Sequence, residues 1–169
     1  SRPNLPPEKD FFGTPEAEIG AKITNLGNLP IIGAGSLDWI ADRNGVPARS
    51  YNKPNPVHAL AAMQTALGQD IKTSLKNAVA ITSQSRNTQK ISDWLELNGA
   101  TVYVFEDSRG GMMSALDAAK ILSNQEVLID LKLIGIGHQP DKTGSLLEIT
   151  DQVYSDINSS PLIDIISAD

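Results

Sequence analysis

The stretch Thr101–Gly111, with the sequence TVYVFEDSRGG, decides the fold. Its first five residues are β-branched or aromatic without a break, which predicts a buried strand over 101–105. Ser108 and the glycines that follow favour the start of a helix, predicted over 112–122. A second apolar run, Leu131–Ile136, predicts another strand soon after that helix. Strand, helix and strand in this order are typical of a parallel sheet.

The chain before this unit continues the same alternation. Short apolar runs at 29–32 and 78–81 predict two further buried strands. Capping residues and terminal glycines mark helices between the strands. We therefore expect an α/β protein with an open, doubly wound, mostly parallel sheet. The predicted helices run from Ser36 to Asn44, from Asn55 to Gly68, and from Asn87 or Thr88 to Asn98.

The first 28 residues differ from the rest of the chain. Three prolines fall within the first seven positions and favour an extended arm over a helix. A length of 169 residues suits one domain, on a prior of roughly 100–200 residues per domain. The sequence therefore predicts an arm over 1–28 and one α/β domain over 29–169.

Composition excludes several classes of protein. The chain has no cysteine, which rules out a disulfide scaffold, a cysteine nucleophile and a cysteine-ligated metal. A net charge of −6 argues against nonspecific binding to nucleic acid. No apolar run approaches the ~18–20 residues that span a bilayer, and the N-terminus lacks an apolar signal-peptide core. We expect a cytoplasmic protein that binds neither nucleic acid nor membrane.

Chemistry in such sheets is found beyond the carboxyl ends of the strands. Glu106 and Asp107 follow the best-predicted strand directly. Adjacent carboxylates at a strand end are suited to Mg²⁺, which takes one or two carboxylates with water and substrate phosphate. Acidic residues before a helix also favour its dipole without binding anything. Both interpretations stay open on the residues alone.

A lysine and a polar loop are further candidates. Lys53 precedes Pro54 beside a predicted helix N-terminus, where an ammonium group can reach a phosphoryl group. The alternative is an ordinary solvated lysine. The run Thr82–Asn87 offers hydroxyl and amide groups to phosphoryl oxygens, or ends in a simple helix cap.

A glycine-rich turn raises the question of nucleotide binding. Gly33, Gly35 and Ser36 follow a predicted strand and open a helix, where backbone N–H groups can cradle a phosphate. The dinucleotide fingerprint needs a third glycine where this chain has Asp38. A plain tight turn is the alternative.

Taken together, residues 29–166 resemble the C-terminal part of the haloacid dehalogenase superfamily of phosphohydrolases. Asn52–Pro56 and the helix after it look like the lysine motif of that family. Val102–Gly111 looks like its acidic metal-binding motif. The closing strand, helix and strand of the family resemble Leu133–Ile136 with Lys142, Leu146, Val153–Tyr154 and Asp156–Asn158.

The resemblance implies roles for these residues. Lys53 would be catalytic, neutralising the nucleophile and the phosphoryl oxygens, and Asp107 with Glu106 would hold Mg²⁺. Ser36 is the hydroxyl candidate in the family's order, whereas Thr82 and Ser83 resemble the hydroxyl motif but follow the lysine.

The family's nucleophile is an aspartate in an Asp-x-Asp motif, and no such motif precedes Lys53. Three explanations fit: a fragment whose missing N-terminal segment holds the nucleophile, a family member that lost catalysis, or a different doubly wound protein. The resemblance implies Mg²⁺-dependent hydrolysis of a small phosphorylated substrate. A homo-oligomer or a missing N-terminal segment is also left open. The alternatives are a noncatalytic binding or assembly module, and a nucleotide-binding domain that uses Gly33–Ser36.

Overall fold

A computed structural model of the chain describes residues 2–10, 15–83 and 91–156. These residues form six α-helices, one 3-10 helix and a small parallel sheet of three strands. The sequence-based expectation of an α/β protein with a parallel sheet is confirmed.

The sheet is built around the stretch that decides the fold. Strand β1 (Thr101–Glu106) pairs in parallel with β2 (Asp130–Ile136), in a register that joins Thr101 to Asp130 and Glu106 to Gly135. Strand β3 (Val153–Tyr154) adds to the other side of β2, giving the order β1-β2-β3. Among the described residues, β1 therefore lies at one end of the sheet.

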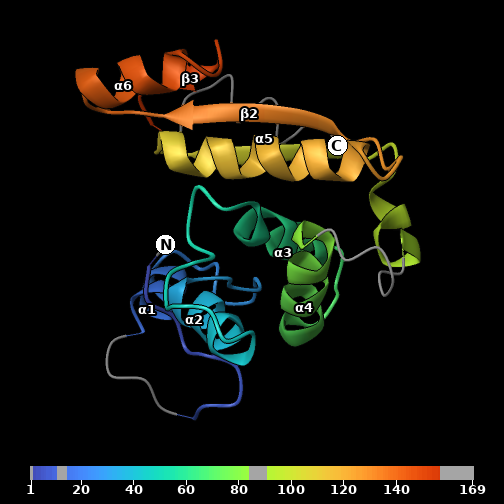
Figure 1. Cartoon of the computed structure of the whole chain (residues 1–169). Helices are drawn as coiled ribbons and strands as arrows, with labels where there is room; N and C mark the ends of the chain where they lie inside the picture. Colours follow the sequence, from blue (N-terminus) through green and yellow to red (C-terminus); the bar gives the residue numbers. More distant parts are fainter. Residues whose placement is uncertain (1, 11–14, 84–90, 157–169) are drawn as a thin grey trace.

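Helix α5 (Arg109–Ser123) connects the two long strands, as the sequence predicts. It begins at Ser108, whose hydroxyl oxygen accepts a hydrogen bond from the Gly111 amide at 3.2 Å. Its buried residues recur at helical spacing and include Met112, Ala118 and Leu122. Figure 1 shows α5 running between β2 and the helices of the N-terminal half.

The main hydrophobic core lies among those helices, which are α2 (Ala34–Arg43), α3 (Pro56–Ala66) and α4 (Ile71–Thr82). Helix α3 begins at Asn55, whose side-chain oxygen accepts from the Val57 amide at 3.0 Å, confirming the predicted cap. The fully buried core side chains include Leu37, Leu60, Leu75 and Trp94.

The predicted strand at 78–81 is wrong, because these residues form the last turns of α4. The helix begins upstream at Asp70, whose carboxylate accepts from the Thr73 amide at 3.0 Å. Within the helix Leu75, Ala78 and Ile81 are buried and spaced at helical intervals. A run of four apolar residues does not distinguish a strand from one face of a helix.

The predicted strand at 29–32 is also wrong. This segment has no regular structure and leads into α2. Leu29 has 58% of its surface exposed, so the run does not form the buried strand that its hydropathy suggested. Helix α2 begins at Gly33, which places Ser36 inside the helix instead of at its cap.

The helix predicted to end at Asn98 is a 3-10 helix over Ile91–Leu97. Trp94 and Leu97 are its buried residues, whereas Leu95 is 55% exposed. Gly99 follows with φ +80°, a conformation that favours glycine, so the predicted stop is confirmed. The predicted caps Asn87 and Thr88 lie outside the described residues.

The N-terminal arm is not extended throughout, because Glu16–Ile23 forms helix α1. It is also joined to the rest of the molecule: Asn4 is buried, and its amide nitrogen donates to the Ser36 hydroxyl at 2.7 Å. Helix α6 (Pro140–Leu147) links β2 to β3. None of the helices in the described ranges combines the length and the apolar character that crossing a membrane requires.

Candidate functional site

The fold brings Lys53 and Glu106 into an ion pair, although 53 positions separate them in the chain. Lys53 lies in the loop before α3, and Glu106 ends strand β1. Their side chains are only 23% and 13% exposed. The Ser108 hydroxyl lies 3.1 Å from the second oxygen of the same carboxylate and donates to it. The pair therefore sits at the carboxyl end of a parallel strand, where α/β proteins place their chemistry.

The backbone of α5 leaves room for this carboxylate at Gly111. A β-carbon at position 111 would overlap the Glu106 carboxylate, so only glycine permits the observed position. At Gly110 a β-carbon would meet nothing closer than the Lys53 side chain, at 3.8 Å. Gly111 thus allows the Glu106 carboxylate to approach the backbone of α5 closely.

His58 is a further residue of this region, to which the sequence assigned no role. It lies in the first turn of α3, and its Nε2 is 3.0 Å from the Ile32 carbonyl, to which it donates. Burial of the ring lowers the pKa of His58 below its usual value, and the nearby Lys53 ammonium lowers it further, whereas Glu106 opposes the shift. The imidazole is consequently neutral at physiological pH.

The two adjacent acidic residues have different environments. Glu106 is enclosed by Lys53 and Ser108, whereas Asp107 is exposed to solvent. Successive residues at a strand end point in different directions, which accounts for this separation. Lys53 therefore meets Glu106 instead of Asp107, on which the family resemblance places most weight.

The carboxylates of Glu106 and Asp107 are oxygen donors of the kind that Mg²⁺ binds. The ion keeps several waters and binds proteins through one or two carboxylates, which Glu106 and Asp107 would supply. Binding at Glu106 would exchange the Lys53 partner for the metal. Among the described residues, no cluster of three or more His, Asp and Glu side chains is present, so such an ion would depend on water and substrate for its other ligands.

A cavity of about 280 Å³ begins at Glu106 and follows strand β1. One wall is the strand itself, over the five consecutive residues from Val102 to Glu106. The other walls are α3 and the first half of α5, and their lining side chains are mostly small. They are His58, Ala59, Ala62, Met63 and Ala66 from α3, and Gly111, Ser114 and Ala115 from α5.

The glycine-rich turn before α2 is occupied by the N-terminal arm. The Asn4 side-chain oxygen accepts from the Ser36 amide at 2.9 Å, and the Arg2 carbonyl accepts from the Ala34 amide at 2.9 Å. A β-carbon at Gly33 would lie 2.6 Å from the Arg2 oxygen. These amides, and the buried Ser36 hydroxyl, therefore bind the arm, and the glycines serve that close approach.

Thr82 and Ser83 end helix α4 instead of following a strand. Their hydroxyls donate to the helix carbonyls of Val79 and Ala80, at 2.8 and 3.0 Å. The carboxyl end of a helix carries the negative end of its dipole, which disfavours phosphate. Neither residue is among the described residues that line the cavity at Glu106.

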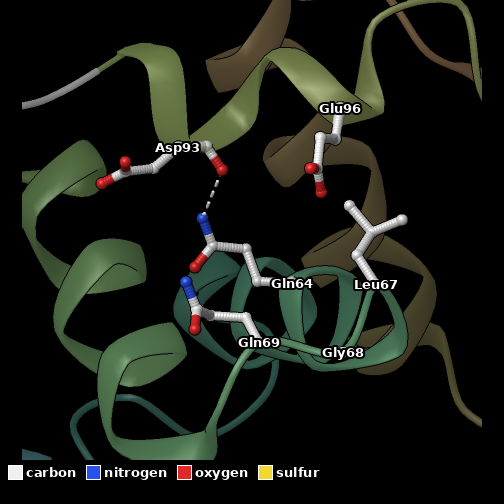
Figure 2. A pocket seen from close by; sticks show the side chains of 6 residues that line it. All are labelled: Gln64, Leu67, Gly68, Gln69, Asp93 and Glu96. Carbon is white, nitrogen blue, oxygen red and sulfur yellow. Dashed lines mark hydrogen bonds between the residues drawn. The ribbon is translucent and has the colours of Figure 1, made fainter.

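A second hollow, of about 220 Å³, lies between the end of α3 and the 3-10 helix. Figure 2 shows its six lining residues, with Gln64 donating to the Asp93 carbonyl at 3.0 Å. Asn77 in turn donates to the Gln64 side-chain oxygen at 3.2 Å. Gln64 thus joins three segments of the core, which explains why an amide is buried there.

Comparison of the chain with protein-family models, with curated proteins and with solved structures finds no match.

Proposed function

We propose that this chain is a phosphate-ester-handling domain of the haloacid dehalogenase type, with Mg²⁺-dependent hydrolysis of a small phosphorylated substrate as its activity. The observation that carries the proposal is the Lys53–Glu106 pair at the carboxyl end of a parallel strand. A cation and a carboxylate at this position are what phosphoryl chemistry requires, because charge on the transferring oxygens must be neutralised.

Each residue has a definite task in this proposal. Lys53 binds a phosphoryl oxygen as a point charge, and Glu106 with Asp107 holds the metal. Bound Mg²⁺ screens the carboxylates from the phosphate. Among the described residues that line the cavity, Glu106 is the one carboxylate, and in this proposal it is a metal ligand. We therefore assign no nucleophile to these residues.

The test is hydrolysis of p-nitrophenyl phosphate in the presence of Mg²⁺ by the whole chain. Lys53→Ala and Glu106→Gln are each expected to lower kcat/KM by about a hundredfold, since each removes a charge that acts on the transferring group. Lys120→Ala, at an exposed position in the last turn of α5, is the matched control and should leave the rate unchanged. Chelation should abolish turnover, and added Mg²⁺ should restore it. Turnover that survives both site substitutions would exclude this site.

A noncatalytic binding module is the second candidate, favoured by one specific observation. Both Glu106 oxygens already have partners, in Lys53 and Ser108, so neither is open to a metal ion in this structure. This candidate predicts no turnover, but calorimetric binding of inorganic phosphate that Lys53→Ala abolishes. Turnover by the parent chain would decide against it.

A further inference from the structure

His58 of α3 and Ser114 of α5 line the same cavity as Glu106, from the two helices that form its walls. The Nε2–H group of His58 donates to the Ile32 carbonyl at 3.0 Å, and the Ser114 hydroxyl donates to the Asn55 carbonyl at 2.8 Å. A neutral imidazole and a hydroxyl each have a single such hydrogen, so both groups have already used theirs. Each of the two side chains can therefore only accept a hydrogen bond from a ligand.

The acceptor atom of His58 is Nδ1. A carbonyl oxygen only accepts, so the contact with Ile32 places the ring hydrogen on Nε2. Burial of the ring lowers its pKa, so Nδ1 keeps its lone pair at physiological pH. His58 makes no second hydrogen bond to residues 2–10, 15–83 or 91–156. Nδ1 is thus a fixed acceptor in a residue that lines the cavity.

The remaining walls of the cavity are mainly apolar, and all of the lining residues belong to the described ranges. Apolar walls with a few fixed polar groups are the usual composition of a site for a small molecule. The small aliphatic side chains among the lining residues are Ala59, Ala62 and Ala66 from α3, Ala115 from α5, and Val102 and Val104 from β1.

The volume of the cavity limits the size of the ligand. A protein cavity of about 150 Å³ holds one benzene molecule. The cavity at Glu106, of about 280 Å³, therefore has room for an aliphatic group of up to roughly ten non-hydrogen atoms, which excludes a nucleoside. Lys53 pairs with Glu106 at one end of this cavity, so a phosphoryl group bound by Lys53 would direct the rest of the ligand along β1.

We propose that this site takes the phosphate monoester of a short aliphatic alcohol with a second hydroxyl group, and that this hydroxyl donates to His58 Nδ1 while the carbon chain packs against the alanines of α3. The inference rests on the function proposed above and specifies its substrate. With water as the second reactant, hydrolysis releases a diol and inorganic phosphate. An alkyl phosphate without the hydroxyl leaves the His58 acceptor unpaired, which selects against it. His58 is therefore a specificity-determining residue.

The test compares the binding of two series of ligands to the whole chain by calorimetry, with EDTA present to prevent hydrolysis. The first series consists of ω-hydroxyalkyl phosphates from hydroxypropyl to hydroxyhexyl. The second has a methyl group in place of each hydroxyl, from n-butyl to n-heptyl phosphate, so the members of each pair match in size. At one chain length or more, the Kd of the hydroxylated ligand is expected to be lower by roughly tenfold or more.

Three variants test the role of His58. His58→Phe keeps an aromatic ring without the acceptor and should make the two series bind equally. His58→Gln keeps both a donor and an acceptor and should retain part of the preference. His138→Phe makes the same change at an exposed position after β2 and should bind like the parent. Circular dichroism establishes that the variants are folded.

Hydrolysis of p-nitrophenyl phosphate with Mg²⁺ separates this inference from the proposed function, because that substrate has no second hydroxyl. Turnover of it by a chain that binds the two series equally would overturn the inference alone. A hydroxyl preference that persists in folded His58→Phe would also overturn it. A chain without turnover that prefers the hydroxylated ligands, and loses this preference in His58→Phe, would exclude hydrolysis and support recognition of the hydroxyl by His58.

Discussion

Glu106 ends strand β1 and contacts the distant Lys53 ammonium, the nearby Ser108 hydroxyl and the backbone at Gly111. A carboxylate that is only 13% exposed needs such partners, because an unpaired charge in this environment is costly. Removal of one partner destabilises a protein more when the ion pair is enclosed than when it is exposed, because the remaining charge is left buried without compensation. The position of the Glu106 carboxylate also depends on the absence of a β-carbon at Gly111.

The two glycines at the start of α5 provide a matched pair of substitutions. Gly110→Ala is expected to stabilise the protein by up to about 1 kcal/mol, since alanine favours a helix and its β-carbon has room here. Gly111→Ala gains the same helix propensity, but its β-carbon would displace the Glu106 carboxylate. Its free energy of unfolding in urea should lie at least about 1 kcal/mol below that of Gly110→Ala. Equal values for the two variants would contradict the arrangement described here.

Helix α4 shows how the residues at the start of a segment determine whether it forms a helix or a strand. Asp70 accepts from the Thr73 amide and so satisfies one of the free donors at the helix N-terminus. Hydrogen bonds from the side chain and the amide of Thr73 lower the pKa of Asp70 below its usual value. Taken alone, residues 78–81 have the apolar pattern of a strand. The cap at Asp70 and the buried Leu75 show that these residues continue a helix.

Loss of this cap has a defined expected cost. Asp70→Ala should lower the free energy of unfolding by about 1 kcal/mol, whereas Asp70→Asn, which keeps the acceptor oxygen, should retain most of the stability. Urea denaturation monitored by circular dichroism measures both. If the two variants are equally destabilised, the charge of Asp70 and not its hydrogen bond is responsible.

At the scale of the whole molecule, the N-terminal arm is connected to two helices of the core through Glu8. Its carboxylate pairs with Arg43 of α2 at 2.6 Å and with Lys72 of α4 at 2.9 Å. The Arg43 guanidinium also lies over the Trp39 ring, 4.6 Å from its centre. Asn4 makes the second connection, at the start of α2. The arm is thus part of the folded structure.

The ion pairs of Glu8 predict that the stability of the folded protein depends on pH. Hydrogen bonds from Lys72 and Arg43 lower the pKa of Glu8 from 4.5 to about 2. The folded state therefore favours the ionised form of Glu8. The contribution of this carboxylate to stability is present above pH 4.5 and is lost as the pH falls toward 2. The stability difference between the parent and Glu8→Gln should shrink over this range, with Glu96→Gln as the exposed control. A Glu8 carboxyl resonance in the folded protein that titrates near 4.5 would disprove the pairing.

The sequence by itself determined the unit from β1 to β2 and the caps at Asn55 and Ser108. These features depend on neighbouring residues: an unbroken β-branched and aromatic run, a capping side chain and a glycine. The same local reasoning failed at 29–32 and 78–81, because four apolar residues are too few to define a period.

Only the tertiary structure decided which side chains meet. Lys53 and Glu106 lie 53 positions apart, and Asn4 reaches Ser36 across 32, so no local pattern contains either contact. The place of β1 at one end of the described sheet is likewise not evident from its sequence, which predicts a buried strand. Strand order is a property of the assembled sheet, because the hydrogen bonds that place β2 between β1 and β3 join residues far apart in the chain.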